Sequence, residues 1–365
     1  MFPKKVVLTS VIASALALSF GARAEDAPKP AVPTLDQVLD ATGLTVSGYL
    51  DAGYEYANKA PADRVFDTNQ NSFDLHQAGL TVAKQPKEGF GGLVNVIAGS
   101  DAQLIHSAPV EDSKFDLTQA YLQYATGPLT VIGGKFVTLA GTEVIASPSD
   151  MNVTRSVLFG AVPFTHTGVR ATYAASDMVS LTAGVNNGWD QMQDANKQKL
   201  LELAVGVTPT KTLSFTAVDY YGTEPNLGGG NSAKELFNLL AAWTATDALT
   251  VNGEYLYVTQ DEAFGPGTNS AKYQGLAGYV TYVINDKWRT TVRAEYFKDS
   301  DGLRFGVLDN KITEATLTLA YLPTKSVELR GEVRTDHASQ DFFADNGGVL
   351  GKSMYSLGAQ AIYKF

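Results

Sequence analysis

The 365-residue sequence contains no cysteine, which excludes disulfide bonds, thiolate metal ligands and thiol catalysis. Histidine is scarce, with four residues in the whole chain, and none of them has the spacing of a metal site. Acidic residues outnumber basic ones, 38 against 28, and the formal net charge is -10. A chain of that sign has no general electrostatic attraction for nucleic acid. We therefore predict no metal, no cofactor and no nucleic-acid partner.

Long hydrophobic runs are also absent beyond the N-terminus, where no window approaches the roughly 20 consecutive apolar residues of a membrane helix. The one apolar run, 6–20, follows two lysines and precedes small residues, the pattern of a cleaved secretory signal. We predict a signal peptide over 1–24 and a periplasmic N-terminal extension over 25–43. Within the extension, a short helix over 34–41 is expected, with Thr34 as its N-cap.

Glycine and aromatic residues are abundant, with 34 Gly, 17 Tyr and 17 Phe. From residue 44 onward, apolar and polar side chains alternate in segments of roughly ten residues, the period of a strand with two different faces. The predicted strands lie near 44–56, 72–84, 90–99, 115–125, 129–137, 165–175, 178–187, 200–208, 211–222, 235–245, 247–260, 271–283, 287–298, 311–322, 325–336 and 353–365.

The connections between these segments alternate between short turns and long polar links. A soluble sandwich has no reason for strict alternation, whereas an outer-membrane barrel has tight periplasmic turns and long outer loops. We therefore predict an all-β fold, an antiparallel transmembrane β-barrel of about sixteen strands over 44–365. Its location would be the outer membrane of a Gram-negative bacterium, with both chain ends in the periplasm.

The last predicted strand ends on an aromatic residue. Tyr363 and the terminal Phe365 lie on its apolar face, and Gln360 and Lys364 lie on the other. An aromatic C-terminal residue closing an alternating strand resembles the signal that outer-membrane barrel proteins present to their insertion machinery. We predict that Tyr363 and Phe365 form this barrel-assembly signal. The alternative is an ordinary edge strand that happens to end in Phe.

Several strands carry charges on one face, as where Arg330 lies between Glu328 and Glu332. That face must be the lumen, because an arginine facing mid-bilayer lipid costs ~2 to 4 kcal/mol. Two interpretations stay open: ion pairs that stiffen the wall, or unpaired charges that line a solute path. The predicted basic wall residues are Arg170, Arg289, Arg293, Arg330 and Arg334, and the acids on the same face include Glu254, Glu295, Glu314, Glu328 and Glu332.

One long stretch, 138–164, does not alternate. Unstructured loops beyond about 15 residues are uncommon and tend to be functional. We predict that this third long loop folds into the barrel lumen and narrows a pore. In trimeric sixteen-stranded porins the third outer loop folds inward, with acids facing basic wall residues. By that resemblance Glu143 and Asp150, together with Arg155, would mark the constriction and oppose wall arginines. The alternative is a loop packed flat over the mouth.

Four passages resemble a named family, the OmpL-like β-barrel porins. They are 43–51 (GLTVSGYLD), 71–80 (NSFDLHQAGL), 99–102 (GSDA) and 156–170 (SVLFGAVPFTHTGVR). The likeness runs over essentially the whole chain after the signal peptide. The resemblance implies an outer-membrane barrel of the porin type, but it implies no particular solute.

Together these features predict passive diffusion of small hydrophilic solutes or ions through a water-filled barrel, without catalysis. Expected partners are outer-membrane lipid, lipopolysaccharide and the insertion machinery. A homotrimer is expected by analogy with general porins, and a monomer is the alternative. Two other classes stay open. A closed barrel could serve as a surface anchor or adhesin. A hydrolase at the rim could use Asp74 and His76, which would share one strand face and could orient a water.

Overall fold

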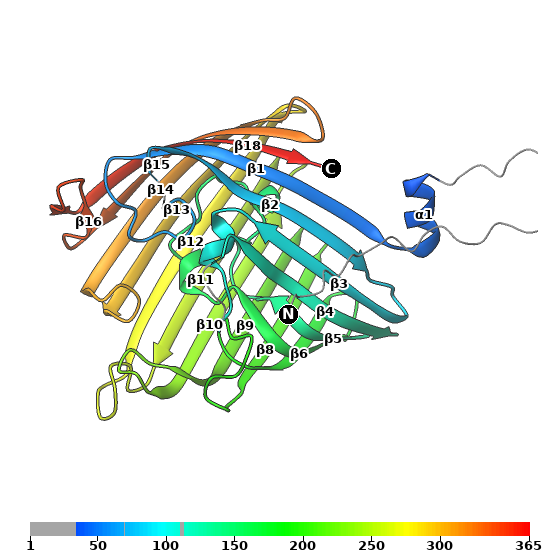
Figure 1. The fold of residues 1–365 in the computed structure, drawn as a ribbon, viewed down its shortest axis with the longest axis horizontal. Coiled ribbons are helices and arrows are strands. Elements are labelled where there is room, and N and C mark those ends of the chain that lie inside the picture. Colours follow the sequence, from blue (N-terminus) through cyan, green and yellow to red (C-terminus); the bar gives the residue numbers. More distant parts are fainter. Residues whose placement is uncertain (1–33, 69, 110–112) are drawn as a thin grey trace, which may run out of the picture.

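The computed structural model describes residues 34–68, 70–109 and 113–365, so the predicted signal peptide over 1–24 and the residues 25–33 lie outside the described residues. Sixteen antiparallel strands form one closed barrel, in which β1 pairs with β18 to complete the ring (Figure 1). The first eight are β1 (Thr45–Ala57), β2 (Ser72–Lys84), β3 (Gly89–Ala98), β4 (Phe115–Thr126), β5 (Leu129–Val137), β6 (Thr165–Ala174), β7 (Val179–Asn186) and β8 (Leu200–Thr210). The others are β9 (Leu213–Pro225), β10 (Asn231–Thr244), β11 (Leu249–Gln260), β12 (Ala271–Asn285), β13 (Trp288–Asp301), β14 (Leu308–Tyr321), β15 (Val327–Ala338) and β18 (Ser353–Lys364).

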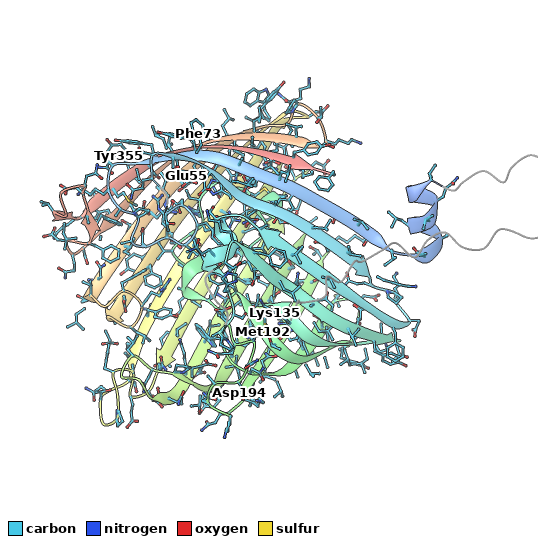
Figure 2. The ribbon with its side chains drawn as sticks, viewed as in Figure 1. Glu55, Phe73, Lys135, Met192, Asp194 and Tyr355 are labelled. Atoms are coloured by element: carbon cyan, nitrogen blue, oxygen red, sulfur yellow. The ribbon has the colours of Figure 1, made fainter. Side chains whose placement is uncertain are left out.

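The predicted antiparallel barrel of sixteen strands is confirmed. Alternation along each strand decides which way its side chains face. On β15, Leu329 and Val333 are 42% and 49% exposed, whereas Arg330 and Arg334 are each 3% exposed. The two faces are also visible at one end of the barrel, where Phe73 on β2 is exposed and Glu55 on β1 is buried (Figure 2). The apolar side chains therefore form the outer, lipid-facing belt, and the charged ones face inward.

Short turns lie at one end of the barrel and longer loops at the other, where the small hairpin of β16 (Phe343–Ala344) and β17 (Leu350–Gly351) projects (Figure 1). Two links that the sequence predicts to be long are short in the structure. Pairing continues between β9 and β10 and between β13 and β14, leaving only 226–230 and 302–307 as loops. The polar residues there do not interrupt a strand, because the backbone ladder continues past the apolar belt.

Helix α1 (Leu35–Thr42) lies outside the barrel at the end that carries the short turns (Figure 1). Its first turn is closed reciprocally. The Gln37 N–H donates to Thr34 Oγ1 at 3.3 Å, and the Thr34 N–H donates to Gln37 Oε1 at 2.9 Å. This capping box satisfies two of the donors that a helix N-terminus leaves free. In the described part of the chain, no helix has the length and apolar character needed to cross a membrane.

The C-terminal residue completes the barrel seam. The Phe365 N–H donates to the Gly48 carbonyl, and the Gly48 N–H donates to the Phe365 carbonyl, both at 2.9 Å. The Phe365 ring lies over Gly48, where an added Cβ would be 2.5 Å from it, so a larger residue at position 48 would displace the ring. Tyr363 and Phe365 are both exposed on the outer face, with ring centroids 6.0 Å apart.

Candidate functional site

The segment 138–164 joins β5 to β6 and contains two short 3-10 turns, Ser147–Ser149 and Phe159–Ala161. Its Val157 and Leu158 side chains are fully buried in one apolar cluster with side chains of the strands. The strand members of this cluster include Leu236 on β10, Leu256 on β11, Tyr273 on β12 and Phe297 on β13. The apolar residues that need burial therefore obtain it against the buried face of the strands.

The backbone N–H groups of the segment have no neighbouring strand to bond with, so they need other acceptors. Glutamates of the barrel wall supply them. Glu295 on β13 accepts the N–H groups of Val157 and Leu158, each at 2.8 Å. Further wall acceptors are Glu332 on β15 for Val153 (2.6 Å) and Thr154 (3.0 Å), and Glu254 on β11 for Thr142 (2.8 Å).

Wall arginines bind the carbonyl groups of the same segment. Arg330 donates through Nη2 to the Asp150 carbonyl at 2.7 Å, and Arg334 donates through Nη1 to the Arg155 carbonyl at 2.6 Å. Arg293 donates to a third carbonyl, that of Thr154, at 2.6 Å. Acids of the wall thus bind N–H groups and arginines of the wall bind carbonyls, which replaces the ladder that a strand would have.

Ion pairs add to this network. Arg293 Nη1 lies 2.7 Å from Glu143 Oε1 of the segment, and Arg293 Nε lies 3.1 Å from Glu314 Oε2 of β14. Within the segment, Arg155 Nη2 lies 2.9 Å from Asp150 Oδ2. The Arg155 guanidinium also donates to the carbonyls of Val144 and Ile145 at 3.0 Å each and stacks against two phenylalanine rings. These charges are held in fixed positions by the segment and the wall together.

The other two predicted wall arginines also have acidic partners. Arg170 on β6 pairs with Glu202 on β8, and its guanidinium lies 4.2 Å from the Phe136 ring centroid. Arg289 pairs with Glu328, which also pairs with Arg330 at 2.7 Å. For all five arginines the geometry favours the interpretation as paired charges of the wall.

Two cavities flank the segment. One, of about 170 Å³, lies between the segment and strands β3 to β5. Its lining includes Asn95, Thr118 and Gln119 from the wall. The other, of about 550 Å³, opens at the long-loop end. Val162 and Phe164 line both cavities, and none of the five predicted wall arginines lines either one. These two cavities therefore lie away from the contacts that the wall arginines make with the segment.

Asp190, in the loop between β7 and β8, fixes the far end of the segment. Its Oδ1 accepts the N–H groups of Phe164 and Thr165 at 2.9 and 2.8 Å. Burial raises the pKa of Asp190 to about 6, while these two N–H groups act in the opposite direction. A carboxyl that gains its charge near neutral pH thus lies at the edge of the larger cavity.

His76, one of the two residues considered for hydrolysis, lies beside a third residue, Asp101. His76 is 7% exposed, and its Nδ1 lies 3.5 Å from Asp101 Oδ1. Asp101 in turn accepts a hydrogen bond from Gln77 Nε2 at 2.8 Å. In the described ranges, no group of three His, Asp or Glu side chains is arranged to hold a metal ion.

Sequence reasoning missed three residues of the larger cavity: Trp189, Lys234 and Arg304. Lys234 stands at an inward position of β10, two residues before the buried Leu236. The alternation along this strand therefore indicates that Lys234 faces the barrel interior. Trp189 and Arg304 lie in loops, where no periodicity indicates which side chains converge.

Comparisons with known proteins agree with this architecture. A family model described as "Putative beta-barrel porin-2, OmpL-like" matches residues 43–365. No curated protein matches the sequence.

Solved structures share the fold at low sequence identity. The outer membrane channel DcaP of Acinetobacter baumannii is 17% identical, with a TM-score of 0.61 over 88% of this chain and 97% of that chain. An anion-selective porin from Comamonas acidovorans is 10% identical, with a TM-score of 0.64 over 88% and 99% of the two chains. OmpT of Vibrio cholerae, in a trimer form, is 15% identical, with a TM-score of 0.60 over 88% and 99%. These likenesses establish the fold.

Proposed function

The chain belongs to this OmpL-like family of outer-membrane β-barrel porins, and we propose that it lets small hydrophilic solutes or ions diffuse passively across the outer membrane. The observation that carries the proposal is the closed sixteen-stranded barrel with a polar inner face and open space beside the segment 138–164. A barrel of this size is wide enough for an aqueous channel.

We further propose that the segment 138–164 lies in the lumen and forms the constriction. Support comes from its contacts with inward-facing charges of β11, β13 and β15, which hold both its N–H and its carbonyl groups. In this proposal Glu143, Asp150 and Arg155 anchor the segment, as do Arg293, Arg330 and Arg334 from the wall. The solute path runs on the other side, between the segment and β3 to β5, past Gln119.

The proposed activity is diffusion and needs neither catalysis nor a cofactor. The partners are then the solutes, the surrounding lipid and lipopolysaccharide, and the machinery that inserts the barrel through its C-terminal Tyr363 and Phe365. A homotrimer is proposed by analogy with OmpT of Vibrio cholerae, one structure of which is a trimer form. Chemical crosslinking in native outer membranes, read as a ladder of one to three subunits, tests that assembly.

Single-channel conductance in a planar bilayer tests the proposed function. The refolded chain 25–365 is expected to insert and conduct in steps, and a variant lacking 141–160 is expected to conduct more. A folded protein that stays silent in both forms would overturn the porin proposal. Silence would favour a surface anchor, and an activity lost in His76→Ala with the fold retained would favour a rim hydrolase.

A further inference from the structure

Two basic side chains line the larger cavity at the long-loop end. Lys234 enters from the start of β10, and Arg304 enters from the loop 302–307. Neither forms a salt bridge with any residue that the structure describes. The Lys234 Nζ lies 3.8 Å from the Trp189 ring centroid, and the buried Arg304 Nε has no hydrogen-bond partner. Two positive groups are therefore available to a ligand.

The other charged groups around the cavity are already engaged. Arg64 forms salt bridges with Asp67 and, at 2.6 Å, with Asp336. Asp190 uses its Oδ1 to accept two backbone N–H groups. Glu224 on β9 is 3% exposed, accepts the Trp189 backbone N–H at 3.2 Å and interacts electrostatically with Lys234, but it forms no salt bridge with it. Lys234 and Arg304 thus keep N–H donors that no salt bridge among the described residues uses, and an anion would accept hydrogen bonds from them.

The rest of the lining is largely apolar and aromatic. The Trp189 indole Nε1 is buried and has no acceptor, so it offers a third donor next to Lys234. The volume of about 550 Å³ is in the range of small-molecule sites, which combine apolar walls with a few polar groups. The apolar and aromatic lining residues include Leu104, Val162, Phe164, Leu227, Tyr273 and Leu303.

The cavity borders directly on the segment 138–164. A Cβ on Gly160 would lie 2.7 Å from Val65 Cγ2 and 3.1 Å from Arg304 Nη2, so glycine allows this close approach. Val162 and Phe164 line this cavity and also the smaller one along β3 to β5. A molecule held beside Arg304 would therefore occupy the entrance to the proposed path.

We propose that this cavity binds small organic carboxylates with an apolar or aromatic body, as the entry site of the channel. Lys234 and Arg304 bind the carboxylate, and Trp189 with its aromatic neighbours contacts the body of the molecule. The inference rests on the proposed porin function, for which it names a class of solute.

Binding can be read from Trp189 itself, because the chain has only three tryptophans. In a background with Trp243→Phe and Trp288→Phe, benzoate is titrated while Trp189 fluorescence is recorded with excitation near 295 nm. Benzamide, which has the same body without the charge, is the matched ligand. A saturable response to benzoate and none to benzamide is expected. Equal responses to the two would overturn the proposal.

Lys234→Gln and Arg304→Gln are made in the same background. The matched control is Lys272→Gln, which replaces an exposed lysine of β12. Each cavity variant should weaken benzoate binding about tenfold or more, because each removes a charged hydrogen bond. Lys272→Gln should bind normally. Unchanged binding in both cavity variants would refute the site.

Conductance in potassium chloride is recorded on the same samples. Channels that conduct but do not bind benzoate would refute only the binding site. A protein that binds benzoate but does not conduct would refute only the porin function.

Discussion

Arg293 on β13 and Glu143 in the segment 138–164 form a buried ion pair, with 2.7 Å between Nη1 and Oε1, although 150 positions separate them in the sequence. The same guanidinium also bonds Glu314 and the Thr154 carbonyl. One side chain therefore connects the segment to two strands. Because the arginine has no exposure to solvent, its partners cannot be replaced by water.

Replacing Arg293 with Met should be strongly destabilising, since it leaves Glu143 buried without its salt-bridge partner. Glu314 would lose its closer arginine and keep only Arg334, at 3.7 Å. Breaking a buried pair by removing one partner costs about 3 to 5 kcal/mol. Urea unfolding of the refolded barrel measures the loss. Arg304→Met, which removes an arginine without an ion pair, is the matched control and should change stability much less. If both variants lose the same free energy of unfolding, the ion pairs of Arg293 do not stabilise the protein in the way described.

Glu295→Gln should loosen the segment, because an amide cannot accept both the Val157 and Leu158 N–H groups as a carboxylate does. A buried donor left without a partner costs about 1 to 3 kcal/mol. We expect that loss in urea unfolding, together with a noisier single-channel current. Glu88→Gln is the control, since Glu88 also accepts a backbone N–H, from Gly127, but in an exposed turn. If Glu295→Gln keeps a quiet current and the stability of the wild type, Glu295 does not anchor the segment.

The strands could be predicted from the sequence because an apolar residue at every second position is a local signal. On β15 that alternation places Leu329 outward and Arg330 inward, and Thr34, directly before α1, is the N-cap that the sequence predicts. The length of the third loop was equally visible, because its pattern stops at residue 138 and resumes at 165.

The partners of the segment could not be predicted in this way. Glu332 accepts the N–H of Val153 across 179 positions of sequence, and no local pattern records such a contact. The sequence shows that Glu332 and Arg334 share a face. It does not show that they bond to backbone groups of a loop, since that depends on how the closed barrel brings the loop to β15. The same holds for the convergence of Lys234, Trp189 and Arg304, which come from β10 and from two different loops.

Asp190 should make stability depend on pH. Its pKa is raised by burial to about 6 in the folded protein, so the folded state holds the proton more tightly than the unfolded chain. The stability from this group is fully present at low pH and is lost as the pH rises through about 6. The urea midpoint should therefore fall more between about pH 4 and about pH 7 in the wild type than in Asp190→Asn. Identical pH profiles for the two proteins would contradict this assignment.

Phe365→Ala should reduce the amount of folded protein in the outer membrane, because the terminal ring covers Gly48 at the seam between β1 and β18. Heat-modifiable migration on gels of outer-membrane fractions measures the folded share. Tyr355→Ala, on the outward face of the same strand, is the matched control. If both variants accumulate equally, the terminal position has no particular role in assembly.

The central claim is that solutes pass between the segment 138–164 and strands β3 to β5, and a single introduced thiol tests it directly because the chain has no cysteine. Gln119→Cys places the thiol in the cavity on that side, and Thr316→Cys places it beside Arg293 beneath the segment. A charged methanethiosulfonate is added to single channels of each variant. We predict that conductance falls in Gln119→Cys and is unchanged in Thr316→Cys. A fall in Thr316→Cys with none in Gln119→Cys would place the path along the arginines and contradict the claim.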